Sequence, residues 1–202
     1  MNGKIENLIS QVKADTEEKT SIASANKVFE NDAEAEREFQ RLSENLKRIE
    51  QWNQFSGASS FGLFDENGGK IPDRPAAIGD FVCIKLPATG KADWVKIVDI
   101  YEGEREKILT VRPTYNPTDE SNDKNVTSHF FTSDSTNNFC LQLKRNEVNM
   151  YVIGLNEISN TEATNNIIES ARNLATANLG HFLGVQKAEW TTFCENFLKS
   201  EN

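Results

Sequence analysis

The sequence is poor in the residues from which metal sites are usually built. Histidine occurs only twice in 202 residues, as His129 and His181, and cysteine occurs three times. The two histidines lie far apart along the chain, and no cysteine is adjacent to either, so the close ligand spacing of a structural zinc site is missing. We therefore expect no metal ion and no cofactor.

The cysteines also give no sign of a disulfide framework. Cys83, Cys140 and Cys194 are odd in number and widely spaced, and no two of them have CxxC spacing. Free thiols are ordinary in a reducing compartment, whereas small secreted domains pair their cysteines. The first fifteen residues alternate polar and apolar side chains and lack the continuous apolar segment of a secretory signal. The sequence therefore predicts a cytoplasmic protein.

Long apolar runs and an excess of basic residues are missing as well. No run approaches the roughly 20 apolar residues that a membrane-spanning helix needs, so we expect no membrane partner. The chain has 22 Lys and Arg against 31 Asp and Glu, a net charge of −9. Because no segment is basic overall, the phosphate backbone of a nucleic acid is a disfavoured partner. These numbers, with twelve phenylalanines, indicate a soluble, acidic, globular protein.

Residues 1–55 carry the pattern of two helices. Apolar residues recur with helical spacing from Ile5 to Val12, and residues 20–26 are expected to be a connection of small residues. A longer helix begins after Asn31, where Glu34 completes a capping-box pattern. Its apolar positions follow the alternating spacing of a coiled-coil seam; they include Phe39, Leu42, Leu46 and Ile49. We therefore predict an N-terminal helical hairpin.

Residues 56–157 have the sequence pattern of β structure. Short runs rich in β-branched and aromatic residues alternate with Gly, Pro, Asn and Asp. The run at 94–101 is apolar on both faces, which predicts a β-bulge or burial on both sides. About seven strands are predicted, at 61–64, 81–86, 94–101, 108–112, 128–132, 139–144 and 148–155.

The segment Ile78-Gly79-Asp80-Phe81-Val82, a turn followed by a strand, resembles the beginning of SH3-like small barrels. The resemblance implies that the meander closes into a small barrel, and the alternative is a strongly bent antiparallel sheet. Residues 158–202 return to helical spacing and predict two helices that pack on the same unit. The predicted fold class is therefore α+β, with a meander of about seven antiparallel strands between two N-terminal and two C-terminal helices.

The sequence contains no complete catalytic motif. The nucleophile-elbow pattern GxSxG is absent, and the acidic turns near Asp65 and Asp119 lack the Gly and Glu of an EF-hand loop. We therefore expect a non-enzymatic protein and assign no catalytic residues. An enzyme that uses convergent carboxylates, with Asp80, Asp93 and Asp99 as candidates, or the thiol of Cys140, is kept as an alternative.

Two surfaces carry hypotheses about function. The seam residues Phe39, Leu42, Leu46 and Ile49 can pack within the chain, on a second copy or on a partner protein. The leading prediction is an interaction or assembly module that acts through protein–protein contacts and self-association of the N-terminal helices. The alternative is a small-molecule-binding β-barrel whose pocket is lined by Phe81, Trp94, Val98, Tyr101 and Met150.

Overall fold

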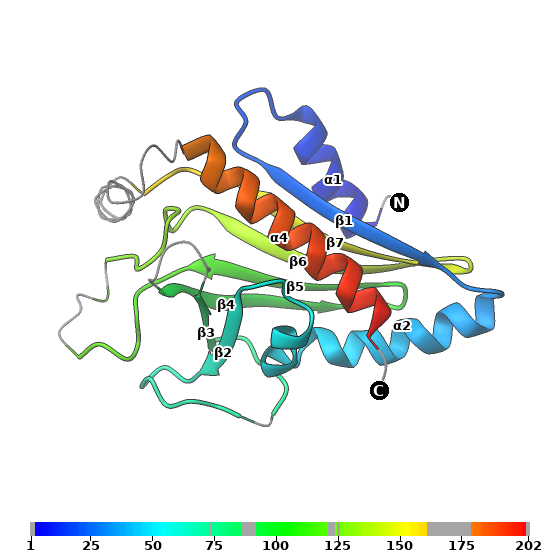
Figure 1. Cartoon of the computed structure of the whole chain (residues 1–202), viewed down its shortest axis with the longest axis horizontal. Helices are drawn as coiled ribbons and strands as arrows, with labels where there is room; N and C mark the ends of the chain where they lie inside the picture. The colour runs from blue at the N-terminus through cyan, green and yellow to red at the C-terminus, as the bar shows by residue number, and fades with distance from the viewer. Residues whose placement is uncertain are drawn as a thin grey trace.

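The computed structural model describes residues 3–72, 74–85, 92–120, 124, 126–160 and 179–200, with the side chains of the last segment described from residue 186. Its centre is one antiparallel sheet of seven strands (Figure 1). The strands are β1 (Ser21–Val28), β2 (Ser60–Phe64), β3 (Phe81–Lys85), β4 (Ala92–Glu102), β5 (Glu106–Pro113), β6 (Thr136–Lys144) and β7 (Glu147–Leu155).

The order of the strands shows that the sheet is open. Strands β2 to β7 lie side by side in the order in which they occur, and β1 adds to β7 at the far side, which gives β1-β7-β6-β5-β4-β3-β2. The two edge strands, β1 and β2, are not paired with each other. The predicted α+β class with a bent antiparallel sheet is therefore confirmed, but the sheet does not close into an SH3-like barrel.

The outer edge of β2 is closed by side chains and by a loop. The Asn53 side chain accepts a hydrogen bond from the Phe61 amide (2.8 Å) and donates one to the Phe61 carbonyl (2.9 Å). The Leu63 amide donates to Glu50 Oε1 at 3.3 Å, and the Leu63 carbonyl accepts from the Ile71 amide at 2.8 Å. Because these backbone groups are already paired, β2 has no free edge with which a barrel could close.

The N-terminal segment differs from its prediction. Helices α1 (Lys4–Ala14) and α2 (Asp32–Leu46) are both present, and a 3₁₀ helix, η1 (Ile49–Gln54), follows α2. Between α1 and α2, however, the stretch predicted as a connection forms β1, which pairs with β7 from Ser21–Gly154 to Val28–Glu147. The predicted helical hairpin is therefore wrong. Ser and Ala have little intrinsic preference for strands, so pairing with β7 overrides the local signal.

Six of the seven predicted strands are confirmed within the described residues. The register between β4 and β5 shifts between Ile97 and Asp99, which confirms the predicted bulge and leaves Val98 38% exposed. The strand predicted at 128–132 is not formed. The Ser128 carbonyl accepts a hydrogen bond from the Trp94 amide, and Phe131 forms an isolated β-bridge with Ser159. The first C-terminal helix predicted by the sequence, over 163–175, lies outside the described residues.

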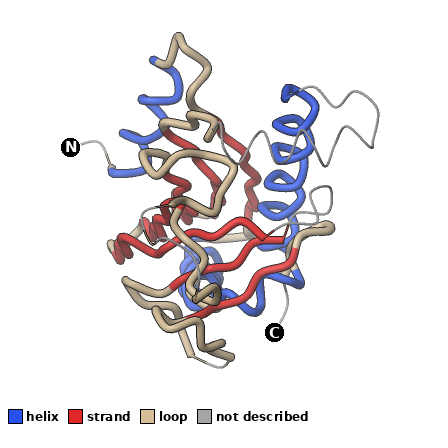
Figure 2. Tube along the Cα trace, turned by 90° about the vertical axis from the view of Figure 1, so that its left-hand side faces the viewer, coloured by secondary structure: helices blue, strands red, loops and turns tan. Residues whose placement is uncertain are grey.

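Helices cover both faces of the sheet. Helix α1 packs on one face, above a cluster that contains Ile5, Ile108, Cys140 and Ile153. Helices α2, η1 and α4 (Leu179–Lys199) pack on the other face, and Figure 2 shows α1 and α4 on opposite sides of the strands. None of the described helices is long and apolar enough to cross a membrane.

The larger core is a cluster of aromatic rings between α4, η1 and the sheet. The ring of Trp52 in η1 lies 4.4 Å from that of Phe139 in β6 and 5.3 Å from that of Phe193 in α4, measured between centroids. Phe61 of β2 joins them at 5.5 Å from Trp52. Such tilted and edge-on pairs add to the stabilisation from area burial. The apolar face predicted for the last helix is thus the surface that holds α4 on the sheet.

Polar contacts fix the position of α4 along the sheet. Glu189 Oε1 accepts hydrogen bonds from three successive backbone amides, those of Gly57, Ala58 and Ser59, at 3.0, 3.1 and 3.0 Å. Burial alone would raise the pKa of Glu189, but the amide hydrogen bonds lower it below its usual value. The ionised carboxylate therefore ties the middle of α4 to the loop that precedes β2.

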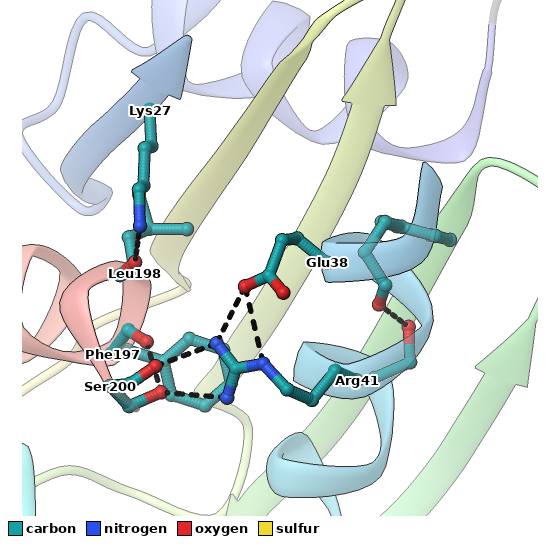
Figure 3. A network of polar contacts seen from close by, with 8 residues as sticks. Lys27, Glu38, Arg41, Phe197, Leu198 and Ser200 are labelled. Atoms are coloured by element: carbon teal, nitrogen blue, oxygen red, sulfur yellow. Dashed lines mark hydrogen bonds and ion pairs between the residues drawn. The ribbon is translucent and has the colours of Figure 1, made fainter. Parts of the chain in front are cut away.

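The C-terminal end of α4 is held by two cations (Figure 3). Arg41 of α2, itself paired with Glu38, donates from Nη2 to the Ser200 carbonyl at 2.6 Å. Lys27 of β1 donates to the Leu198 carbonyl at 3.4 Å. The last carbonyls of a helix lack partners within the helix and carry the negative end of its dipole, so cations at this end are stabilising.

We predict that Phe193→Ala lowers the free energy of unfolding by about 3–5 kcal/mol, because it removes a fully buried ring from the centre of this cluster. Val28→Ala is the matched control: Val28 is 62% exposed, and its truncation should change stability by about 0.5 kcal/mol or less. Urea unfolding followed by circular dichroism measures both. Equal effects of the two substitutions would contradict the packing described for α4.

Candidate functional site

The predicted protein-contact seam is buried inside the chain. Phe39, Leu42, Leu46 and Ile49 all belong to the main core, beneath the sheet face that α2 and η1 cover. The prediction that these residues form an exposed contact surface is therefore corrected. The alternating apolar spacing shows that one face of the helix is covered, but it does not distinguish a sheet of the same chain from a helix of another chain.

The residues of the predicted pocket do not come together. Phe81 and Trp94 share a small buried cluster with Cys83, whereas Met150 lies on the opposite face of the sheet in the main core. Tyr101 packs against the cluster beneath α1, and Val98 points to solvent at the bulge. Because successive residues of a strand face opposite sides, sequence proximity did not place these side chains on one surface.

Most of the residues considered for catalysis are engaged or inert; Asp93 is partly buried, and its Oδ1 accepts a hydrogen bond from the Phe130 amide at 3.2 Å. Asp80 is held by two hydrogen bonds from Arg74, each 2.7 Å long, and by the Ala77 amide. Cys140 is fully buried, and burial raises the pKa of its thiol far above the usual value, so the thiol stays protonated and is a poor nucleophile. Asp99 is exposed beside the bulge, apart from both of these environments.

A cavity of about 380 Å³ lies where the end of α1, the start of β1 and α4 meet; we call it the α1–α4 cavity. Much of its wall is apolar. Val12 comes from α1, Ile22 and Ala23 from β1, Val152 from β7 and Trp190 from α4. The charged side chains that line it are Asp15, Glu18, Glu157 and Lys187, and the remaining lining residues are Thr20, Ser21 and Gln186.

Glu157 is placed in this cavity by the turn that follows β7. Asn156 adopts a left-handed conformation with φ 53°, which Asn tolerates better than most residues and which turns the chain sharply. The Asn156 carbonyl accepts from the Ser135 hydroxyl at 2.5 Å. The Glu157 amide then donates to the Lys19 carbonyl at 2.8 Å, which ties the turn to the residues just before β1.

The carboxyl group of Glu157 occupies space that a glycine leaves open. Gly154 of β7 pairs with Ser21 of β1, and a Cβ atom at position 154 would collide with Glu157 Oε1. The same Cβ would stand 2.6 Å from the Ser21 hydroxyl oxygen. Glycine in a strand often marks a close approach of another group, and here it admits the folded-back glutamate.

The electrostatic state of Glu157 is unusual for a carboxyl group. Burial raises its pKa to about 7, and the hydrogen bond from the Ser21 hydroxyl offsets only part of this effect. No lysine or arginine among the described residues lowers the pKa of Glu157. Near neutral pH the cavity therefore holds a partly ionised carboxyl group, and no cation among the described residues contributes to its shift.

Trp190 supplies a second polar group without a partner. Its side chain is only 6% exposed, and its indole nitrogen has no hydrogen-bond acceptor in the part of the chain that the structure describes. The ring packs edge-on against Phe139, with centroids 5.4 Å apart, so it is fixed in place. Buried polar groups are nearly always hydrogen-bonded, but this indole nitrogen is closed off from solvent and does not open into the cavity.

Asp15 places a negative charge in the cavity wall. Its carboxylate accepts from the Glu17 amide and from the Thr20 hydroxyl, both at 2.9 Å. The Glu17 amide hydrogen bond lowers the pKa of Asp15 more than partial burial raises it, so this carboxylate is ionised at neutral pH. The loop between α1 and β1 is thus organised around a fixed anion.

A second hollow, of about 660 Å³, lies over β2, β3 and β4 and includes Trp94. Its polar lining is largely committed to the fold, because Asn53 and Glu50 pair with the β2 edge as described above. Burial raises the pKa of Cys83 in its wall, so that thiol is protonated as well. The α1–α4 cavity is the stronger candidate because the shift of its Glu157 carboxyl involves one hydroxyl partner and no cation among the described residues.

Sequence reasoning missed Glu157 and assigned Trp190 only to an apolar helix face. One signal was available: Gly154 interrupts the apolar run 148–155, and an isolated glycine within a strand indicates a close approach. That signal marks the strand but not the approaching side chain. The pairing of β1 with β7, which brings Ser21 to this point, could not be read from the weak local pattern of residues 20–26.

Comparison with protein-family models finds no match, and comparison with curated proteins finds none either. Solved structures of similar outline include a hypothetical protein, jhp0584, from Helicobacter pylori, at 10% identity and a TM-score of 0.48, with 91% of this chain and 89% of that chain covered. Ginseng major latex-like protein 151 from Panax ginseng matches at 11% identity and a TM-score of 0.45, covering 89% and 96%.

Protein Ms6760 from Mycobacterium smegmatis matches at 10% identity and a TM-score of 0.44, with 93% of this chain and 96% of that chain covered. Likenesses at this level carry no argument about what the chain does. The assignment of a function therefore rests on the contacts within the α1–α4 cavity.

We predict that Glu157→Gln removes a pH-dependent loss of stability. The folded-state pKa of about 7 exceeds the ordinary value of 4.5, so the native protein binds more protons than the unfolded chain between these values. The contribution of Glu157 is therefore favourable below about pH 4.5 and is lost as pH rises to about 7, by up to about 3 kcal/mol.

Urea unfolding near pH 5 and near pH 8 should thus show Glu157→Gln gaining stability relative to the wild type at the higher pH. Comparing the two proteins at each pH cancels the titration of all other groups. A constant difference between them across this range would show that the Glu157 pKa is not raised.

Proposed function

We propose that this protein binds a small organic molecule in the α1–α4 cavity, and that it does so in the cytoplasm. The observation that carries the proposal is the Glu157 carboxyl, a largely buried acid in the wall of this mostly apolar cavity whose titration is affected by one polar contact, the Ser21 hydroxyl. A few convergent polar groups in a mostly apolar cavity of this volume are typical of small-molecule sites.

Binding is supported over catalysis by the composition of the wall. As far as the structure describes the cavity, its lining includes neither histidine nor cysteine, the residues most often used as catalytic base and nucleophile. The three free, buried cysteines are compatible with the reducing cytoplasm. The alternative of a protein–protein module ranks lower, since the helical seam on which it was based lies in the core.

We predict that Val12→Trp weakens ligand binding, because Val12 is a partly exposed wall residue and a tryptophan there would occupy part of the cavity. A fragment library screened by thermal unfolding should contain compounds that stabilise the wild type. At about one hundred times the Kd, a ligand should raise Tm by about 5 °C or more.

Gln11→Trp is the matched control, since Gln11 is the exposed neighbour on α1 and does not line the cavity. It should respond to the same fragments as the wild type. Circular dichroism establishes that both variants fold. Fragments that stabilise Val12→Trp as much as the wild type would place their binding elsewhere, and a screen without any stabilising compound would reject the proposal.

A further inference from the structure

The charges in the α1–α4 cavity are unbalanced. Asp15, Glu18 and Glu157 are acidic, and Lys187 is the one basic side chain among its described lining residues. The whole chain adds to this field, with a net charge of −9. A cavity lined mainly by one sign of charge concentrates ligands of the opposite sign. An anionic ligand would therefore meet repulsion on approach and at the wall.

Glu157, the most buried of these acids, has no cation among the described residues that affects its titration. Burial, rather than repulsion by another acid, is the main influence on Glu157, and the Ser21 hydroxyl is its one polar contact among those that affect its titration. A buried carboxylate is normally stabilised by a cation or by several hydrogen-bond donors. A positively charged group of a ligand would supply the counterion that the described residues do not provide for Glu157.

Trp190 adds a second feature that suits a ligand of this kind. Its aromatic ring, which lines the cavity, is a favourable surface for an organic cation. The apolar side chains of Ala23 and Val152, which belong to the same core cluster, accommodate the hydrocarbon part of such a molecule.

We propose that the ligand of the α1–α4 cavity is a small organic ammonium ion. Its ammonium group pairs with the Glu157 carboxylate, and its hydrocarbon part lies against Trp190 and the apolar wall. This inference rests on the proposed function and specifies the chemical class of the ligand. The rival class is a neutral ligand whose carbonyl accepts from a protonated Glu157, and the two classes differ in their dependence on pH.

The ammonium ligand requires Glu157 to be ionised. Its affinity should therefore rise as pH increases toward about 7 and should level off above that value. Below this pH, binding should release a proton from Glu157. The other charged groups facing the cavity are Asp15 and Glu18 from the α1–β1 loop and Lys187 from α4. Their contribution is held constant by comparing wild type with a Glu157 variant at each pH.

Three isosteric probes test the inference by isothermal titration calorimetry: phenylalaninol, the diol in which a hydroxyl replaces its amine, and phenyllactate. They share one aromatic ring on a three-carbon chain: phenylalaninol replaces one hydroxyl of the diol by an ammonium group, and phenyllactate replaces its hydroxymethyl group by a carboxylate. At pH 8 the wild type should bind phenylalaninol at least about tenfold more tightly than the diol, and phenyllactate more weakly than either. Near pH 5.5 the preference for phenylalaninol should fall toward unity, and its enthalpy should depend on the ionisation enthalpy of the buffer.

Two variants remove the carboxylate in different ways. Glu157→Gln should abolish the preference for phenylalaninol and retain binding of the diol. Gly154→Ala places a methyl group where the Glu157 carboxyl lies, and the colliding atoms are the flexible ends of side chains. It should therefore displace the carboxyl, abolish the same preference and leave the fold intact.

The outcomes separate the inference from the proposed function. A wild type that binds the diol or phenyllactate as tightly as phenylalaninol at pH 8 overturns the ammonium class while the cavity remains a binding site. A preference that survives both variants overturns the role of Glu157. Failure of all three probes to bind also overturns the inference, and the fragment screen with Val12→Trp then decides separately whether the cavity binds anything.

Discussion

The packing of α4 against the aromatic cluster is the contact on which the rest of the structure depends. The rings of Trp52, Phe139 and Phe193 join the last helix to η1 and to the middle of the sheet. Because strands β1 and β7 lie under the same helix, this contact also sets the distance between α4 and the turn after β7. The α1–α4 cavity is the space that remains where the cluster ends, with Trp190 belonging to both.

Two glutamates show how the environment within one fold decides the state of a carboxyl group. Glu189 receives three backbone amides and is held ionised, so it works as a structural anchor. Glu157 is buried with one hydroxyl as its partner, so its neutral form is stabilised instead. Residue type and sequence position give no hint of this difference, which comes from the number of donors that the folded chain directs at each oxygen.

The sequence predicts those parts of the fold whose signal is local. Strands β3 to β7, the bulge at Val98 and the capped start of α2 at Asn31 follow from alternation, apolar runs and capping chemistry. It does not predict β1, because Ser and Ala carry little strand preference and the pairing partner lies more than one hundred residues away. The candidate site depends on that pairing, since Ser21 and Glu157 meet only across β1 and β7. The candidate site could therefore not be predicted from the sequence, although most of the strands could be.

The attachment of α4 has a mechanical consequence. Arg41 and Lys27 donate hydrogen bonds to backbone carbonyls at its C-terminal end, and Glu189, near its middle, accepts hydrogen bonds from the loop before β2. The C-terminal half of α4 is therefore held at two points. Gln186 and Lys187, which line the cavity, lie on the other side of Glu189. These contacts fix the direction of the helix axis, and with it the orientation in which Gln186 and Lys187 are presented to the cavity.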